Sequence, residues 1–195
     1  MAESAHAGTE GPVYESSGNP TGRLAMWWFL ASEIVIFGGL VFTYLLFLWR
    51  YPEWTEEAAH TLANAGALNT AVLLTSSYFV VLAHDAAHNG RFQKAAALLA
   101  MTVAGGFVFL GVKAFEYSHE IHAGFVPSRS VFWSFYYTMT GLHALHVIGG
   151  MVAMTIVALA VRKGQNPQRV EYVGIYWHFV DVVWIFLFPL LYLAS

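Results

Sequence analysis

The sequence contains no cysteine and few charged residues. Only 11% of its 195 residues are charged, with nine Lys and Arg against 12 Asp and Glu. Without cysteine the chain can form no disulfide, thiolate nucleophile, iron–sulfur ligand or C-x-x-C-H haem attachment. The sparse basic residues make no stripe that could neutralise phosphates, so nucleic-acid binding has no electrostatic support. The chain is instead rich in apolar residues, at 57% of the total.

These apolar residues are gathered into five long runs. A run of about 20 apolar residues crosses a hydrocarbon core of about 30 Å. The runs cover residues 24–49, 67–83, 95–115, 131–161 and 172–193. The predicted fold class is therefore all-α, an integral membrane bundle of five transmembrane helices.

The segments outside the runs are short and contain no Ser/Pro-rich linker. Three glutamates and no lysine or arginine precede residue 20, a composition unlike a signal peptide. We expect residues 1–23 to form a cytoplasmic N-terminal tail and residues 24–195 to form a single membrane domain.

The basic residues predict the orientation of this bundle. Five spans bring the N-terminal tail and the loops 84–94 and 162–171 to one side of the membrane. That side carries Arg23, Arg91, Lys94, Arg162, Lys163 and Arg169. By the positive-inside rule, the N-terminus is cytoplasmic and the C-terminus is outside.

Six ionisable side chains fall inside the runs, where a charge costs about 3 kcal/mol on insertion scales. They are Glu33, Lys113, His143, His146, His178 and Asp181. Glu33 and Asp181 lie about 14 Å from the starts of their helices, near mid-membrane. A carboxyl at that depth is either protonated or paired with a cation. It could handle protons, grip a polar lipid group, or form an interhelical hydrogen bond that fixes helix register.

The buried histidines occur in two spaced pairs. His143 lies three positions before His146, and His178 three positions before Asp181, so each pair shares a helix face. Histidines facing each other across a bundle could ligate haem or copper if second-shell groups held them neutral. Helix packing is the more frequent role of such residues.

Two further clusters lie at the ends of the runs. His84, Asp85 and His88 have a spacing that could bind zinc, and a second group resembles a carboxylate metal site. The second group comprises Glu116, His119, Glu120 and His122. Neither has a complementary motif elsewhere, which favours solvated helix ends and caps.

Lys113 and Glu116 stand three residues apart near the predicted outer interface. We expect this lysine to be neutralised by pairing with the glutamate or by snorkelling. Depth also ranks two substitutions: Asp181→Leu should weaken assembly more than Glu116→Ala, because Asp181 lies at mid-membrane and Glu116 near an interface.

The order of several motifs resembles one known family, subunit III of the haem-copper oxidases. The first is WWFLASEIVIFGG, which contains Glu33; ALNTAVLLTSS and an AH-x5-GR stretch follow. The most specific are FYYTMTGLHALHVIGG and YWHFVDVVWIFLFPLLYL, which contain the two histidine pairs. The motifs that carry the resemblance occur in the same order along about 170 residues.

This resemblance implies a non-catalytic subunit of a terminal oxidase in the bacterial cytoplasmic membrane. It would carry no cofactor of its own and would pack on subunit I, beside subunit II, where haem and copper reside. It would support proton uptake and sustained turnover, and bind phospholipid in a cleft. Cytochrome c or quinol would donate electrons to the complex. Glu33 would lie beside the cleft; His143, His146, His178 and Asp181 would form a polar network; Trp177 and Trp184 would belong to the packed or lipid-facing surface.

Two features depart from the family pattern. Many members have seven helices, so this chain resembles the shorter five-helix bacterial type. Lys113, in GVKAFEY, stands where many members have glutamine, and this variant also looks like accessory proteins of nitric oxide reductases. Three rival functions stay open: such an accessory protein, a self-contained haem-binding membrane protein, and a proton transporter.

Overall fold

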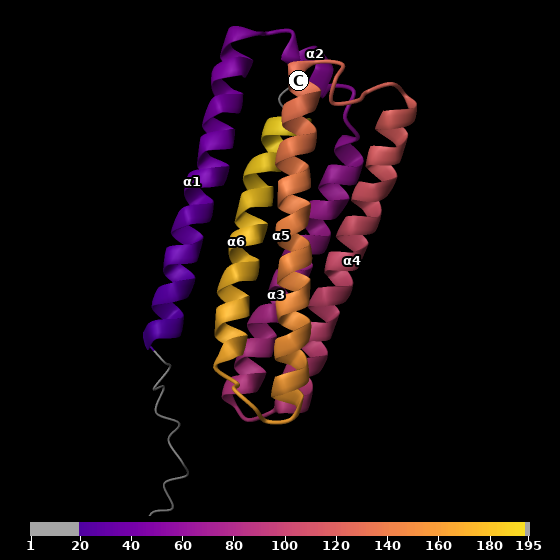
Figure 1. Cartoon of the computed structure of the whole chain (residues 1–195). Coiled ribbons are helices and arrows are strands. Elements are labelled where there is room, and N and C mark those ends of the chain that lie inside the picture. The colour runs from indigo at the N-terminus through magenta and orange to yellow at the C-terminus, as the bar shows by residue number, and fades with distance from the viewer. Residues whose placement is uncertain (1–19, 194–195) are drawn as a thin grey trace, which may run out of the picture.

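A computed structural model describes residues 20–193, which fold entirely into helices and their connections (Figure 1). Five helices are long and apolar enough to cross a membrane. The predicted all-α fold with five spans is thereby confirmed. The helices are α1 (Pro20–Arg50), α2 (Trp54–Ala58), α3 (Ala63–His88), α4 (Phe92–His122), α5 (Val131–Arg162) and α6 (Arg169–Tyr192).

The helices extend beyond the apolar runs that predicted them. Helix α3, predicted at residues 67–83, begins at Ala63 and ends at His88, and α4 continues seven residues past the predicted end to His122. Polar residues can continue a helix beyond its apolar run, so the run predicts the most apolar part of each helix alone. Helix α1 begins at Pro20, within the predicted tail, while residues 1–19 lie outside the described residues.

The short helix α2 was not predicted. It lies in the connection between α1 and α3, at the end of the bundle where α4 and α6 end and α5 begins (Figure 1). This end is called the α2 end below. The start of α1 and the turns α3–α4 and α5–α6 lie at the opposite end.

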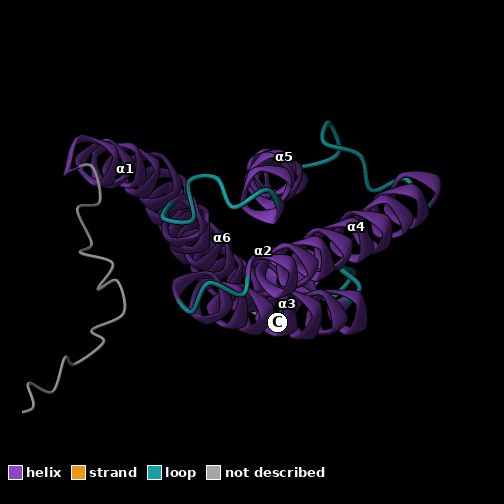
Figure 2. Cartoon of the chain, turned by 90° about the horizontal axis from the view of Figure 1, so that it is seen from below, coloured by secondary structure: helices purple, strands orange, loops and turns teal. Residues whose placement is uncertain are grey.

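Helices α3, α4, α5 and α6 pack together, whereas α1 stands to one side. Seen along the bundle in Figure 2, α1 lies at its edge, and its main contacts are with α6 and α5. Large apolar side chains of α1 therefore remain exposed, including Val35 at 74% and Phe42 at 63%. Lipid or another protein must cover them in a membrane.

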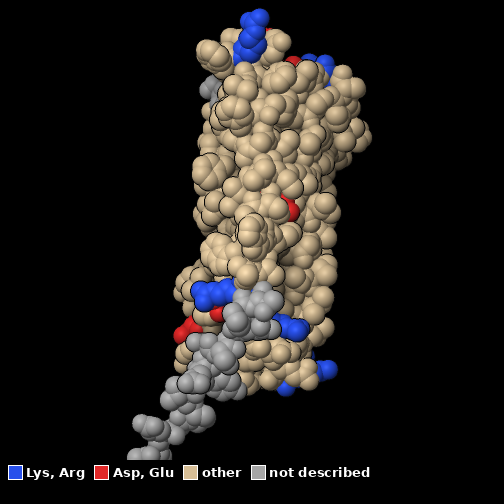
Figure 3. Space-filling model, turned by 60° about the vertical axis from the view of Figure 1, so that its left-hand side comes forward, with Lys and Arg blue, Asp and Glu red and all other residues tan. Residues whose placement is uncertain are grey.

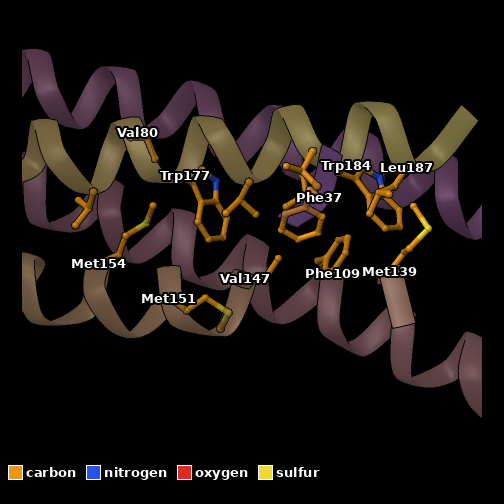
Figure 4. Close-up of a cluster of buried hydrophobic side chains, with 14 of the residues drawn as sticks. Phe37, Val80, Phe109, Met139, Val147, Met151, Met154, Trp177, Trp184 and Leu187 are labelled. Atoms are coloured by element: carbon orange, nitrogen blue, oxygen red, sulfur yellow. The ribbon is translucent and has the colours of Figure 1, made fainter. Parts of the chain in front are cut away.

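The buried core runs along the seam between α3, α4, α5 and α6, and Phe37 of α1 also packs into it (Figure 4). Trp177 of α6 lies in this core, directly against two glycines. A Cβ atom at Gly150 would lie 2.9 Å from its indole ring, and a Cβ atom at Gly106 would lie 3.3 Å from it. These two glycines let α4 and α5 approach a large side chain, as small residues do in membrane bundles.

The surface separates charge from apolar area. On the face drawn in Figure 3, Lys, Arg, Asp and Glu atoms gather toward the two ends of the molecule, with a mostly uncharged band between them. This distribution is that of a chain whose middle faces hydrocarbon and whose ends face headgroups and water.

Candidate functional site

The first candidate site joins α1 to α5. His146 Nε2 lies 3.0 Å from Glu33 Oε2, and its Nδ1 lies 2.8 Å from the carbonyl oxygen of Leu142. A carbonyl oxygen accepts only, so Nδ1 carries a hydrogen. The pair then shares one more proton, either as imidazolium with carboxylate or as neutral imidazole with a protonated Glu33. The two side chains are 12% and 11% exposed, so the pair lies at the margin of the packed bundle.

His143 lies in a different environment from His146, although the two share a helix face. It is fully buried, against Phe109 of α4 at 5.4 Å and Trp184 of α6 at 5.2 Å between ring centroids. Among the described residues, neither ring nitrogen has a hydrogen-bond partner. The structure thus places the two histidines in separate contacts, one toward α1 and one inside the bundle.

His178 and Asp181 both face Ser77 on α3. The Ser77 hydroxyl contacts His178 Nδ1 at 2.5 Å. Asp181 is 4% exposed, has Ser77 as its polar neighbour, and within residues 20–193 neither of its carboxyl oxygens has a partner of good geometry. This polar contact ties α6 to α3.

Two tryptophans of α6 add hydrogen bonds to α3. Trp177 Nε1 donates to Ser76 Oγ at 3.0 Å, and Trp184 Nε1 donates to Thr70 Oγ1 at 3.0 Å. Both rings are buried, at 0% and 1% exposure. They belong to the packed interior, so the lipid-facing placement allowed above does not apply to this chain.

The second candidate site is a buried cluster on α4, α5 and α6. Lys113 Nζ lies 3.0 Å from Glu116 Oε2 and donates to the hydroxyls of Tyr136 and Tyr192 at 3.1 and 2.7 Å. The Tyr136 hydroxyl donates to Glu116 Oε1 at 2.7 Å and also lies 3.0 Å from Glu120 Oε1. We call these five residues the lysine cluster.

The lysine cluster corrects the prediction of solvated helix ends for Glu116 and Glu120. Lys113, Glu116 and Glu120 are 3%, 0% and 1% exposed, because the face of α4 that carries them packs against α5 and α6. Their spacing at positions i, i+3 and i+7 is the signal that would have indicated one buried helix face. Tyr136 and Tyr192 were missed because aromatic residues in an apolar run carry no polar signature.

The remaining metal-site candidates do not converge. Asp85 accepts hydrogen bonds from Arg91 at 2.8 Å and from Asn89 at 3.0 Å, which closes the turn between α3 and α4. His119 and His122 are exposed. In the described part of the chain, no three His, Asp or Glu side chains gather into a group that could hold a metal ion.

Comparison with known proteins decides the family. The family model of cytochrome c oxidase subunit III matches residues 16–195. The chain belongs to the cytochrome c oxidase subunit III family. The subunit III resemblance is thereby confirmed, and as a subunit III of a haem-copper oxidase the chain is part of an oxidoreductase complex.

Three relatives illustrate the range of the family. The chain is 33% identical to the cytochrome bo(3) ubiquinol oxidase subunit 3 of Pseudomonas aeruginosa, covering 94% of this chain and 88% of that protein. It is 36% identical to the cytochrome c oxidase subunit 3 of Thermostichus vulcanus, covering 86% of this chain and 84% of that protein. It is also 32% identical to the heme-copper oxidase subunit I+III of Aeropyrum pernix, covering 88% of this chain and 22% of that protein.

Proposed function

We propose that this subunit III is a non-catalytic subunit that packs directly on subunit I, which with subunit II carries the haems and copper of the complex. The observation that carries the proposal is the relative named subunit I+III, in which the matching region forms part of one longer protein. Two proteins that are fused in one organism are commonly contacting subunits in another. Haem and copper chemistry then belongs to the partners.

The unpartnered face of α1 is the structural support for this contact and for bound lipid. Its exposed apolar side chains need a cover of protein or acyl chains. A pocket of about 430 Å³ lies where Gly22 of α1 meets Val157 of α5 and Arg169 of α6. A phospholipid seated there would place its headgroup phosphate at Arg169 and its chains along α1, beside Glu33.

The proposed setting is a bacterial cytoplasmic membrane with the start of α1 on the cytoplasmic side. Arg91, Lys94, Arg162 and Lys163 line one surface pocket at that end of the bundle, which supports this orientation by the positive-inside rule. The relatives include a subunit 3 named for a ubiquinol oxidase and one named for a cytochrome c oxidase, so either quinol or cytochrome c would suit the complex as its electron donor. The chain itself would support proton uptake and sustained turnover.

The test is co-purification of the tagged chain from its native membrane in mild detergent. The proposal predicts subunits I and II in the preparation by mass spectrometry, together with oxygen consumption driven by cytochrome c or by quinol. Recovery with nitric oxide reductase subunits and nitric oxide consumption would assign it instead to that accessory role, which Lys113 in place of glutamine favours. Recovery of the chain without any oxidase subunit would overturn the proposal.

A further inference from the structure

The lysine cluster holds more negative charge than positive charge in a buried site. One cation, Lys113, faces two carboxyl groups, Glu116 and Glu120, and all three are nearly inaccessible to solvent. The two glutamates are four residues apart on one helix face, where like charges repel. A buried net charge costs several kcal/mol unless a partner compensates it.

The hydrogen atoms of the cluster are also one too few if both carboxyl groups are ionised. Tyr136 has a single hydroxyl hydrogen but lies 2.7 Å from Glu116 Oε1 and 3.0 Å from Glu120 Oε1. The three hydrogens of Lys113 point to Glu116, Tyr136 and Tyr192. The Tyr192 oxygen lies 3.2 Å from the Tyr136 oxygen, and its hydroxyl hydrogen cannot serve either contact between Tyr136 and a carboxyl group. In one of the two contacts between Tyr136 and a carboxyl group, two oxygen lone pairs would then face each other with no hydrogen between them.

Glu120 is the group that lacks partners. Its Oε2 atom is buried and has no hydrogen-bond partner among the described residues, whereas both oxygens of Glu116 are bonded. An ionised carboxylate with an orphan oxygen is far more costly to bury than a neutral acid with an orphan carbonyl oxygen. A proton on Glu120 removes the excess charge and supplies the missing hydrogen.

Other titratable groups around the cluster are already engaged. On α4, the Tyr117 hydroxyl pairs with Thr140 at 2.6 Å; on α5, Tyr137 donates to the carbonyl oxygen of Phe125 at 2.8 Å. Beyond them, Glu57 of α2 accepts from Trp133 Nε1 at 2.7 Å. Three more groups contact aromatic rings near the cluster. His60 stacks on Phe125, and Arg129 lies over the same ring. His143 lies against Trp184. None of these contacts supplies Glu120 with a second cation.

We propose that the lysine cluster is a proton-binding site in which Glu120 holds one proton and donates it in a hydrogen bond to the Tyr136 oxygen. Glu120 is two residues from the end of α4, at the α2 end, where the neighbouring His119 and His122 are exposed, so a brief opening of this helix end would bring its buried carboxyl to water. On release, the carboxyl O–H bond breaks and the proton passes to water, leaving a buried carboxylate beside Glu116. The seam between α4, α5 and α6 is therefore tightest with the proton bound.

The direct test is infrared difference spectroscopy on the purified complex, comparing wild type with Glu120→Gln in H2O and D2O. The proposal predicts that the variant loses one protonated-carboxyl C=O band, which shifts in D2O and disappears from the wild type as pH is raised. Glu57→Gln is the matched control, because its carboxyl accepts from an indole N–H outside the lysine cluster, and this variant should keep the protonated-carboxyl band that Glu120→Gln loses. Absence of a lost protonated-carboxyl band in Glu120→Gln would overturn the proposal.

A stability measurement separates this role from a merely structural one. Glutamine mimics a protonated glutamate, so Glu120→Gln should match the thermal stability of wild type at neutral pH and lose its decline at higher pH. Glu116→Gln should be less stable, because it removes the counter-ion of Lys113. Equal losses of thermal stability in both variants would contradict a bound proton. So would a wild-type stability that changes when Na⁺ or K⁺ replaces N-methylglucamine but does not change with pH.

Discussion

Two largely buried pairs of ionisable side chains, one on α1 and α5 and one on α4, differ in how the surrounding helices hold them. Glu33 and His146 join α1 to α5 through one contact, with about a tenth of each side chain exposed. Lys113 and Glu116 lie inside α4 and are enclosed by hydroxyls from α5 and α6, at 3% and 0% exposure. The first pair attaches a peripheral helix, whereas the second is part of the core.

The same contrast separates the helices themselves. Helix α6 places Trp177 and Trp184 between α3, α4 and α5, while α1 leaves apolar side chains such as Val35 exposed. The chain thus combines a four-helix core with one arm, α1, which packs Phe37 and Tyr44 into that core and leaves its outer apolar side chains to be covered by lipid or by a partner subunit. Substitutions in the core should affect folding, and those at the arm should affect assembly.

The largest effect is expected from Lys113→Met. The change leaves Glu116 buried without its cation, and breaking one partner from a buried pair costs about 3–5 kcal/mol. The free energy of unfolding, measured by detergent denaturation, should fall by that amount. Lys163→Met, at an exposed position, is the control and should stay near wild type. A small loss at Lys113 would remove the distinction between core and arm.

The double variant Lys113→Met/Glu116→Met should recover at least half of that loss. Replacing a whole buried ion pair with apolar side chains is often close to neutral, since neither charge then remains without its partner. The same denaturation experiment measures the recovery. A double variant less stable than Lys113→Met would mean that Glu116 stabilises the bundle independently of the lysine.

Glu33→Ala should cost the isolated bundle about 1 kcal/mol or less, since one interhelical hydrogen bond in a membrane contributes little. In the complex we expect unchanged haem content but lower retention of this chain, less bound lipid, or a faster decline of activity during turnover. Glu53→Ala, an exposed neighbour of α2, is the control. Loss of haem from the assembled enzyme would contradict the proposed role of the arm.

The smallest effect is expected for Arg91→Ala. Arg91 and Asp85 form a surface pair at 2.8 Å with side chains 51% and 61% exposed, and such pairs contribute about 0.2–1 kcal/mol. Denaturation of this variant should differ from wild type by no more than that. A loss as large as that of Lys113→Met would show that burial does not rank the ion pairs.

Long apolar runs were sufficient to predict the five spans, but the partners of the buried polar residues were not predictable. The Lys113–Glu116 contact is local to one helix, so spacing alone indicated it. Glu33 and His146 are 113 positions apart, and Lys113 and Tyr192 are 79 apart, so their contacts depend on how the helices pack. Residue type indicated that these polar groups need partners inside the bundle, but it did not indicate which side chains contact each other.

Burial in the bundle and depth along the helix rank two substitutions in opposite orders. Depth ranks Asp181→Leu above Glu116→Ala on the premise that Glu116 lies near an interface, whereas the structure shows Glu116 fully buried and paired. Among residues 20–193 Asp181 has no cation beside it, so its loss leaves no opposite charge uncompensated. We now expect Glu116→Ala to reduce the yield of assembled complex more than Asp181→Leu, measured by quantitative immunoblotting; the reverse order would favour depth as the deciding quantity.

The measurement that tests the central claim most directly is the reduced-minus-oxidised optical spectrum of this chain, isolated and within the complex. We predict that the isolated chain has no Soret band and that His143→Phe leaves the spectrum of the complex unchanged, because His143 packs among aromatic rings. A Soret band from the isolated chain that disappears in His143→Phe would contradict a non-catalytic subunit III.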